Sequence, residues 1–340
     1  MDDEEITSDP VRDTARAAPG RARTQARARA GFFLLLAAAL SGCVSLPQSE
    51  ALRAAAAADL AERVELTGVP FHTQDDFLCG PASLAMVINA AGVPATVEGL
   101  TPLVYLPERR GSLQAEMLGA TRRQGLVAYV LPPNLEDVLR EVAAGTPVVA
   151  LLNFGIRIFP LWHYAVVVGY DLGKREVVLR TGSTPRRLVP LGFFEYLWRD
   201  SGHWALVALP PGKLPASGRE AEFAAAVAAL ERTGRHAEAR SSYRALVARW
   251  PTSLIGLVGL GNVEYALGDR AAAERVFRRA TEADPSSGAA LNNLAHALAV
   301  LGRVDEAEAA ARRALSLGGP AAEQAQKTLD EILALKLRHP

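Results

Sequence analysis

The stretch Gln74-Asp75-Asp76-Phe77-Leu78-Cys79-Gly80-Pro81-Ala82-Ser83 decides the fold of this chain. A proline is well tolerated in the first turn of a helix, so we expect a helix from Pro81 to Ala91 with Cys79 at its amino end. The free amides and the dipole at the start of a helix favour a thiolate over a thiol. The stretch therefore predicts a nucleophilic cysteine rather than a buried structural one.

A second stretch, His163-Tyr164-Ala165-Val166-Val167-Val168-Gly169-Tyr170, begins 84 residues after Cys79. Its β-branched and aromatic residues predict a strand whose first residue carries an imidazole. An imidazole beside a thiol takes its proton and so activates the sulfur for attack on a carbonyl carbon. His203 also precedes an apolar run, Trp204 to Leu209, and is the rival candidate for the base.

The pattern between residues 66 and 211 predicts an α+β domain, with helices first and an antiparallel sheet second. Ser112 and Asn134 are the expected N-caps of the second and third helices. The expected helices are Pro81–Ala91, Leu113–Arg123 and Leu135–Ala144. The expected strands are Val127–Leu131, Pro147–Asn153, Tyr164–Tyr170, Arg175–Arg180 and Trp204–Leu209, with a hairpin turn over residues 171–174.

The composition limits the classes of function. The 37 basic and 37 acidic residues give a formal net charge of zero, which argues against a nucleic-acid surface. The 6 histidines and 2 cysteines show no metal-ligand spacing, and no glycine-rich phosphate loop precedes a helix. The sequence therefore predicts no metal, no cofactor and no nucleic-acid partner.

Beyond residue 211 the composition shifts to Ala, Arg, Glu and Leu, and three series of residues recur every 34 residues. A helix-turn-helix period of this length is typical of tetratricopeptide repeats. We expect a linker over residues 212–218, then three repeats and a capping helix over residues 219–340. The recurring residues are Gly234, Gly268 and Gly302; Ala239, Ala273 and Ala307; and Tyr243, Phe277 and Ala311.

Residues 1–42 have the features of a targeting segment rather than of a folded domain. A positive stretch without acids, which contains Arg21, Arg23, Arg27 and Arg29, precedes an apolar core of ten residues, Gly31 to Leu40, which is too short to span a bilayer. The run Leu40-Ser41-Gly42-Cys43 resembles the bacterial lipoprotein signal, in which cleavage precedes a lipid-carrying cysteine. The resemblance implies lipidation of Cys43 and, because Val44 follows, an outer-membrane lipoprotein that faces the periplasm. We expect residues 43–65 to be a lipid-anchored tether, with a helix over the Ala-rich run Ala51 to Arg63, and globular structure to begin near Val64.

Residues 66–211 resemble the bacteriocin-processing (double-glycine leader) peptidases and their stand-alone relatives, which share the papain-like fold. The resemblance implies that Cys79 is the nucleophile, that His163 is the base and that Gln74 donates a hydrogen bond to the oxyanion. In this family no base precedes the nucleophile, which excludes His72. The residues that carry the resemblance are Val69-Pro70-Phe71, Gln74, Leu78-Cys79-Gly80-Pro81-Ala82 and the run from His163 to Asp171.

The third member of the predicted site departs from the family pattern. Relatives carry an Asp or Asn after the histidine hairpin, whereas the run Val178 to Pro185 contains neither a carboxylate nor an amide. An imidazole that transfers protons still needs a group that fixes its tautomer. Thr181, Ser183 and Asp171, or a backbone carbonyl, are the candidates for this group.

Together these features predict a lipid-anchored cysteine peptidase or amide hydrolase, in which Cys79 attacks a peptide carbonyl and His163 shuttles the proton. The repeats would recruit a protein or peptide partner. Two alternatives stay open: a degenerate papain-like binding module that scaffolds a complex, and acyl or amine transfer by the same thiol. The missing acid favours the binding module, whereas the retained Cys, His and Gln favour the enzyme.

Overall fold

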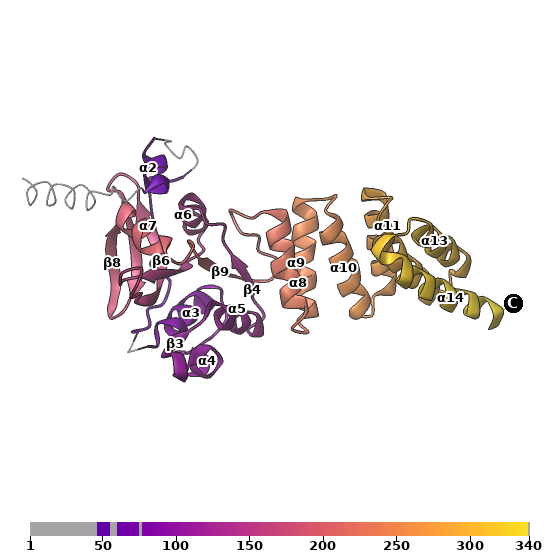
Figure 1. Ribbon diagram of the computed structural model, residues 1–340, viewed down its shortest axis with the longest axis horizontal. Coiled ribbons are helices and arrows are strands. Elements are labelled where there is room, and N and C mark those ends of the chain that lie inside the picture. The colour runs from indigo at the N-terminus through magenta and orange to yellow at the C-terminus, as the bar shows by residue number, and fades with distance from the viewer. Residues whose placement is uncertain (1–45, 55–59, 75–76, 339–340) are drawn as a thin grey trace, which may run out of the picture. The chain divides into compact units, whose positions relative to one another are not determined.

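The computed structural model of the 340-residue chain describes residues 46–54, 60–74 and 77–338 (Figure 1). The predicted signal segment, Cys43 with its predicted lipid, and Asp75 and Asp76 lie outside the described residues. Over the described part, an α+β region leads into a region made of helices, as predicted. No helix in these ranges is both long enough and apolar enough to cross a membrane.

A seven-stranded antiparallel sheet forms the centre of the α+β region. Six strands lie in the order β4-β9-β5-β6-β7-β8, and β1 pairs with the end of β6, where Arg63 lies opposite Asp171. Because β6 pairs with β5, β7 and β1, it is the strand around which the sheet is built. The strands are β1 (Arg63–Glu65), β4 (Val127–Val130), β5 (Val148–Asn153), β6 (Trp162–Asp171), β7 (Glu176–Thr181), β8 (Thr184–Pro190) and β9 (Ala205–Leu209).

Helices cover both faces of this sheet, because its central strands carry apolar side chains on both faces (Figure 1). In β6, Tyr164 and Val166 pack in one core with α3, α4 and α5, whereas Ala165 and Val167 pack in a second core with α6 and α7. This alternation follows from the two-residue period of a strand. The helices are α3 (Cys79–Ala90), α4 (Val97–Val104), α5 (Gln114–Arg123), α6 (Leu135–Ala143) and α7 (Leu191–Arg199).

The three predicted helices and five predicted strands of this region are present, with their ends shifted by one or two residues. Asn134 caps α6 as predicted, since its Oδ1 accepts a hydrogen bond from Glu136 N at 2.9 Å. Ser112 does not cap α5: Leu113 occupies the cap position, and Ser112 Oγ has no hydrogen-bond partner among the described residues. Ser112 instead ends a small hairpin, which is formed by β2 (Tyr105–Leu106) and β3 (Gly111–Ser112).

This small hairpin, α4, α7 and β8 are not predicted from the sequence. β8 is an edge strand that carries Pro185 and Pro190 and exposes most of its side chains, so it lacks the apolar alternation that indicates a strand. α4 contains Pro102, a residue that normally argues against a helix. β8 forms by pairing with β7, and α4 begins at its N-cap Thr96, whose Oγ1 accepts a hydrogen bond from Gly99 N at 3.1 Å.

The segment predicted as a tether is folded in part. α2 (Pro47–Ala54) begins before the helix expected from Ala51 to Arg63, and Arg63 lies in β1 instead. The amides of Gln48 and Ser49 donate to the Glu195 carboxylate of α7 at 3.0 and 2.7 Å. The negative charge of Glu195 also stabilises α2, because it lies at the positive end of the helix dipole. Folded structure is therefore already present before Val64, in α2.

Seven helices follow the α+β region and carry the recurring residues. Gly234, Gly268 and Gly302 adopt positive φ angles of 80°, 91° and 76° in the turns between paired helices, a conformation that glycine adopts without strain. The recurring alanines, Ala239, Ala273 and Ala307, are fully buried where the helices approach one another. The helices are α8 (Glu220–Glu231), α9 (His236–Arg249), α10 (Leu254–Ala266), α11 (Arg270–Ala283), α12 (Gly288–Val300), α13 (Val304–Ser316) and α14 (Ala322–Arg338).

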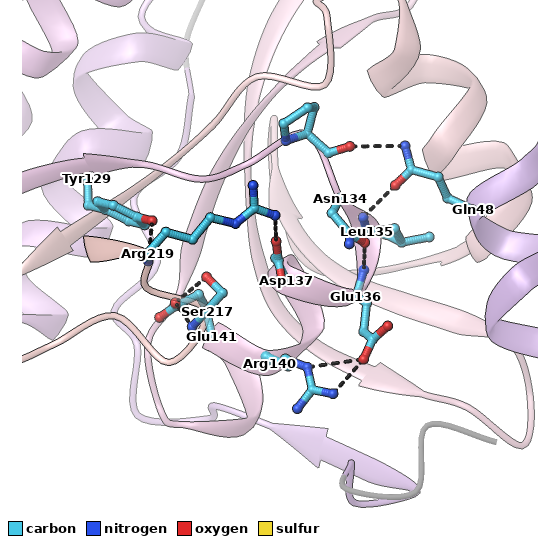
Figure 2. Close-up of polar contacts among 11 residues, drawn as sticks. Gln48, Tyr129, Asn134, Leu135, Glu136, Asp137, Arg140, Glu141, Ser217 and Arg219 are labelled. Atoms are coloured by element: carbon cyan, nitrogen blue, oxygen red, sulfur yellow. Dashed lines mark hydrogen bonds and ion pairs between the residues drawn. The ribbon is translucent and has the colours of Figure 1, made fainter. Parts of the chain in front are cut away.

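The predicted linker, residues 212–218, is fixed by polar contacts with α6 and β4 (Figure 2). The buried carboxylate of Glu141 accepts hydrogen bonds from Ser217 N at 2.9 Å and from Ser217 Oγ at 2.8 Å. Arg219 N donates to Tyr129 Oη at 3.3 Å, and the Arg219 guanidinium lies 3.8 Å from Asp137. The Tyr129 ring lies edge-on to Phe223 of α8, with 6.2 Å between ring centroids. One continuous core therefore joins the sheet to the first repeat.

We predict that Phe223→Ala lowers the free energy of unfolding by about 3–5 kcal/mol, because it leaves a cavity in the core between β4 and α8. Three of the four tryptophans lie in the α+β region and one, Trp250, directly follows α9, so fluorescence reports mainly the α+β region, whereas far-UV circular dichroism reports mainly the repeat helices. In a denaturant titration we expect both signals to move together to a lower midpoint.

The exposed neighbour Glu222→Ala is the matched control, and its free energy of unfolding should change by about 0.5 kcal/mol or less. A loss of circular dichroism at lower denaturant with an unchanged fluorescence midpoint would show that the two regions unfold independently.

Candidate active site

Cys79 is the first residue of α3, a helix that is buried over most of its length. Pro81 stands in the first turn, where its missing N–H would have had no acceptor within the helix. No side chain caps α3, and no described residue accepts a hydrogen bond from the backbone amides of Cys79 or Gly80. The sulfur therefore lies beside free amides at the positive end of a helix.

The surroundings of the sulfur act on its pKa in two directions. Burial raises the pKa of the Cys79 thiol above its ordinary value. The backbone amides of Tyr164, Gly80 and Cys79 itself lower that pKa, because each can donate to a thiolate. The amide of Tyr164 can act on the sulfur only if the sulfur lies against β6. The sulfur therefore meets β6 at the peptide group that joins His163 to Tyr164.

His163 is the second residue of β6, and neighbouring strands hold its ring. Its Nε2 lies 2.8 Å from Thr181 Oγ1 at the end of β7. Phe154, which follows β5, lies edge-on to the ring with 5.6 Å between centroids. Since side chains alternate along a strand, His163 faces Thr181 and Phe154 while Tyr164 faces α3. With Nε2 bonded to Thr181, Nδ1 is the ring nitrogen that remains to exchange a proton.

The electrostatics keep this histidine neutral. Burial lowers the pKa of His163 to about 4, and the nearby positive charge of Arg187 adds to the effect. Burial also disfavours the charged form of Cys79, as its raised pKa shows. Both shifts therefore favour an uncharged resting pair, a thiol and a neutral imidazole, over a thiolate and an imidazolium.

Gln74 connects α3 to β6 and to the turn after β7. Its Nε2 donates to Ser83 Oγ at 2.8 Å and to Tyr164 O at 3.3 Å, and its Oε1 accepts from Gly182 N at 2.7 Å. Ser83 Oγ also donates to Tyr164 O, at 3.2 Å. Because an amide nitrogen carries two hydrogens, both are engaged here. Gln74 thus links α3, β6 and the turn after β7 by hydrogen bonds. Its role as oxyanion donor stays a prediction.

The other candidate histidines have different surroundings. His203 packs edge-on against Trp198 of α7, with 4.9 Å between ring centroids, and burial lowers its pKa. His72 Nε2 lies 3.2 Å from Asn89 Nδ2, at the far end of α3, which is about 15 Å along the helix from Cys79. No group of three or more His, Cys, Asp or Glu could hold a metal ion within the part of the chain that the structure describes.

Among the three candidates for the orienting residue, Thr181 is the one that hydrogen-bonds to His163. Asp171 ends β6, eight residues beyond His163, and its Oδ1 accepts a hydrogen bond from Lys174 N in the following turn. Ser183 is exposed in the turn between β7 and β8. For the neutral ring to offer a lone pair at Nδ1, Nε2 must carry the hydrogen and donate it to Thr181.

Sequence reasoning assigns no role at the site to Ser83 or Tyr164, and it expects Ser112 only as a helix cap, whereas Ser112 lies beside Gly80. Ser83 follows Cys79 by four residues, one helical turn, so its spacing was a usable signal. Tyr164 and Ser112 meet α3 only through the tertiary fold. Gly80 explains the approach of Ser112: an added Cβ would lie 2.2 Å from Ser112 Oγ, so only glycine fits there.

These residues form a candidate thiol site on an α+β domain that is followed by helical repeats. Residues 66–203 match the model of the Peptidase C39 like family. Residues 220–253 and 258–330 match tetratricopeptide-repeat models. The chain therefore carries a C39-like peptidase domain followed by tetratricopeptide repeats, which confirms the resemblance predicted for residues 66–211 and the fold class. No curated protein matches the chain.

Three solved structures are similar to parts of the chain. A putative C39-like peptidase from Bacillus anthracis is 21% identical and covers 44% of this chain and 98% of its own, with a TM-score of 0.38. The Yersinia enterocolitica type III secretion chaperone SycD, in complex with a peptide of the translocator YopD, is 19% identical and covers 34% of this chain and 93% of its own, with a TM-score of 0.32. The first tetratricopeptide domain of Spaghetti (RPAP3), bound to an HSP90 peptide, is 19% identical and covers 35% and 93%, with a TM-score of 0.33.

We predict that alkylation of Cys79 by iodoacetamide is slow at neutral pH and accelerates only above the ordinary thiol pKa, which is about 8.5. The thiolate is the reacting form, and its fraction falls as the native pKa rises. Rates are measured against pH in a Cys43→Ser chain, whose one remaining thiol is Cys79. The same chain unfolded in urea is the reference, and its midpoint should lie at lower pH. A rapid plateau between pH 5 and 7 would instead indicate a preformed thiolate–imidazolium pair.

Proposed function

We propose that this protein is a cysteine peptidase that hydrolyses peptide bonds with Cys79 as nucleophile and His163 as general base. One observation carries the proposal: the backbone amide of Tyr164, the residue after His163, acts on the Cys79 thiol and lowers its pKa, and Thr181 Oγ1 lies 2.8 Å from Nε2 of the His163 ring. A nucleophile, a base beside it and a third group that orients the base are the parts that thiol catalysis needs.

In the acylation step, Nδ1 of His163 takes the thiol proton as the sulfur attacks the peptide carbonyl carbon. The carbonyl electron pair moves to the oxygen, where the free amide of Cys79 donates to it. Gln74 Nε2 can add a second donor if it exchanges its 3.3 Å bond to Tyr164 O for the oxyanion. The protonated imidazole then passes its proton to the leaving amine as the carbon–nitrogen bond breaks.

In the deacylation step, His163 takes a proton from water while the water oxygen attacks the thioester carbon. The carbon–sulfur bond breaks, the peptide acid leaves and the thiol recovers its proton. Thr181 has no charge with which to stabilise the imidazolium, so its contribution is to fix the ring and its tautomer. We infer a general-base mechanism that starts from an uncharged pair, and a slower enzyme than one with a carboxylate in this position.

The repeats and the predicted lipid anchor bear on where the proposed peptidase acts and how it finds its substrate. Tetratricopeptide repeats present extended surfaces to proteins and peptides, so we infer that they recruit a protein partner or substrate. The run that ends at Cys43 supports attachment to the outer membrane through a lipid, with the domain facing the periplasm. In that setting the peptidase would act on envelope proteins brought to it by the repeats.

The test of the proposal uses a peptidyl electrophile that labels active cysteine peptidases. We expect labelling of the Cys43→Ser chain and none after the further change Cys79→Ala. His163→Asn should slow labelling by about 10²–10⁴-fold, because it removes the base. His203→Asn is the matched control and should label at the parental rate, since asparagine tolerates the φ of 58° at that position.

Equal labelling with and without Cys79 would remove the thiol from the mechanism. If His203→Asn and not His163→Asn abolished labelling, the base would be His203. Full absence of labelling and of peptide cleavage in the parent would favour the alternative, a binding module that retains the papain-like fold.

A second prediction concerns Thr181. Thr181→Val keeps the side-chain shape but leaves the buried Nε2–H of His163 without an acceptor, a loss of about 1–3 kcal/mol. We expect kcat for a fluorogenic peptide to fall about 10–100-fold with little change in KM. Thr181→Ser retains the hydroxyl and should keep most of the activity. Equal kcat values for the valine and serine variants would show that the hydroxyl does not orient the ring.

A further inference from the structure

The loop between β5 and β6 exposes an unusual run of large apolar side chains. Ile156, Ile158, Phe159, Leu161 and Trp162 are all exposed, and Ile158 and Phe159 at the tip reach 77% and 75% of full exposure. We call these five residues the apolar hairpin. Soluble domains rarely expose contiguous apolar side chains without a binding partner for them.

The backbone of the apolar hairpin is tightly held. Asn153 is buried, and its Oδ1 accepts hydrogen bonds from Gly155 N and Leu161 N, each at 2.9 Å. Ile156 and Phe159 bond to each other through their backbones at 3.2 and 2.9 Å. Gly155 is required, since an added Cβ would lie 2.3 Å from Phe159 O. A constructed turn therefore presents these side chains to solvent.

The hairpin leads directly into the proposed catalytic residues. Trp162 is bonded to His163, and Phe154, at the other end of the loop, packs edge-on against the His163 ring. On the cysteine side, Phe77 lies two residues before Cys79 and is exposed, as is Leu113, which follows Ser112 beside Gly80. Exposed apolar side chains therefore lie on both sides of the reacting groups.

Three arginines lie beside these apolar side chains, whereas Asp200, which accepts a hydrogen bond from Asn153 Nδ2 at 3.0 Å, is paired with Arg199 at 3.4 Å. Arg110 lies over the Phe77 ring with 5.8 Å to its centroid, and Arg187 lies over Phe154 with 5.6 Å to its centroid. Arg157 stands in the hairpin itself. None of these three guanidiniums forms an ion pair with an acid among the described residues. A basic occupant would be repelled here, and a neutral or acidic one would not.

We propose that the apolar hairpin is the specificity element of the peptidase, which binds a segment of peptide substrate rich in aliphatic or aromatic residues and free of Lys and Arg beside the scissile bond. This inference rests on the proposed function. An anionic membrane is the other surface that apolar and basic groups fit. A loop that inserts into a membrane requires apolar side chains only at its tip. Here apolar side chains lie on both sides of the thiol and the imidazole, which favours a peptide that binds between them.

The experiment compares the full chain carrying Cys43→Ser with the same chain carrying Ile158→Ser and Phe159→Ser. Two fluorogenic peptides are used, one with Leu and Phe flanking the scissile bond and one with Ser and Asn. We expect the parent to prefer the apolar peptide at least 10-fold in kcat/KM. We expect the double variant to lose about 10–100-fold on the apolar peptide, mainly in KM, and little on the polar one.

Two controls separate this inference from the proposed function. Ile255→Ser removes a comparably exposed side chain from α10 and should leave both peptides unaffected. Iodoacetamide at pH 9 alkylates Cys79 without having to bind the hairpin, so its rate of reaction should be the same for the parent and the double variant. If neither the parent nor any variant cleaves either peptide, the result contradicts the proposed function itself.

Equal kcat/KM values for the parent and the double variant on the apolar peptide would overturn the inference while leaving the peptidase intact. So would a parent that prefers the polar peptide, or one that cleaves Lys- and Arg-flanked peptides best. Sedimentation with phosphatidylglycerol vesicles tests the other occupant. Co-sedimentation of the parent but not of the double variant, together with unchanged peptide cleavage, would make the hairpin a membrane element and overturn the proposal.

Discussion

The contact between the amino end of α3 and β6 is the constraint on which the site depends. Gln74, Ser83 and the carbonyl of Tyr164 form one hydrogen-bonded group, and the amide of the same Tyr164 faces the Cys79 sulfur. The carbonyl of Tyr164 thus holds α3 in place, and the amide of Tyr164 faces the nucleophile. Because His163 is the preceding residue, the packing of α3 also sets where the thiol lies relative to the imidazole. The contacts that pack α3 against β6 are therefore the ones that would set the geometry of the proposed catalytic groups.

Burial has opposite consequences for stability and for reactivity at this position. It encloses α3 in an apolar core, and it also disfavours the charged forms of both Cys79 and His163. Free amides at the helix start offset this effect only in part. A hydroxyl in place of a carboxylate beside the imidazole fits such an uncharged pair, since a buried carboxylate would itself carry an unfavourable desolvation cost. The chemistry then depends on positioning more than on a preformed ion pair.

The repeats are attached to the peptidase domain through packed side chains rather than through a free linker. Glu141, Tyr129 and Phe223 tie the end of the sheet to the first repeat helix. A single core that crosses this junction lets the first repeat contribute to the stability of the sheet that carries His163. A partner bound on the repeats would therefore act on a domain to which the repeats are mechanically coupled.

The sequence alone determined the elements whose signals are local. Pro81 after Cys79 marked the start of α3, the alternating apolar residues marked β6, and the 34-residue period marked the repeats, because backbone geometry imposes these patterns on neighbouring residues. The resemblance to a thiol peptidase followed from the same short stretches. For the group that orients the imidazole, the sequence left Thr181, Ser183, Asp171 and a backbone carbonyl as candidates.

Only the tertiary structure decided which side chains meet. Thr181 reaches His163 because β7 lies beside β6, and Asp171 does not because it stands at the other end of the same strand. The packed α2, the edge strand β8 and the bound linker likewise arise from contacts between distant parts of the chain. Local patterns encode a residue's own backbone and face, whereas pairing between strands and the closure of a core depend on partners that no short stretch of sequence contains.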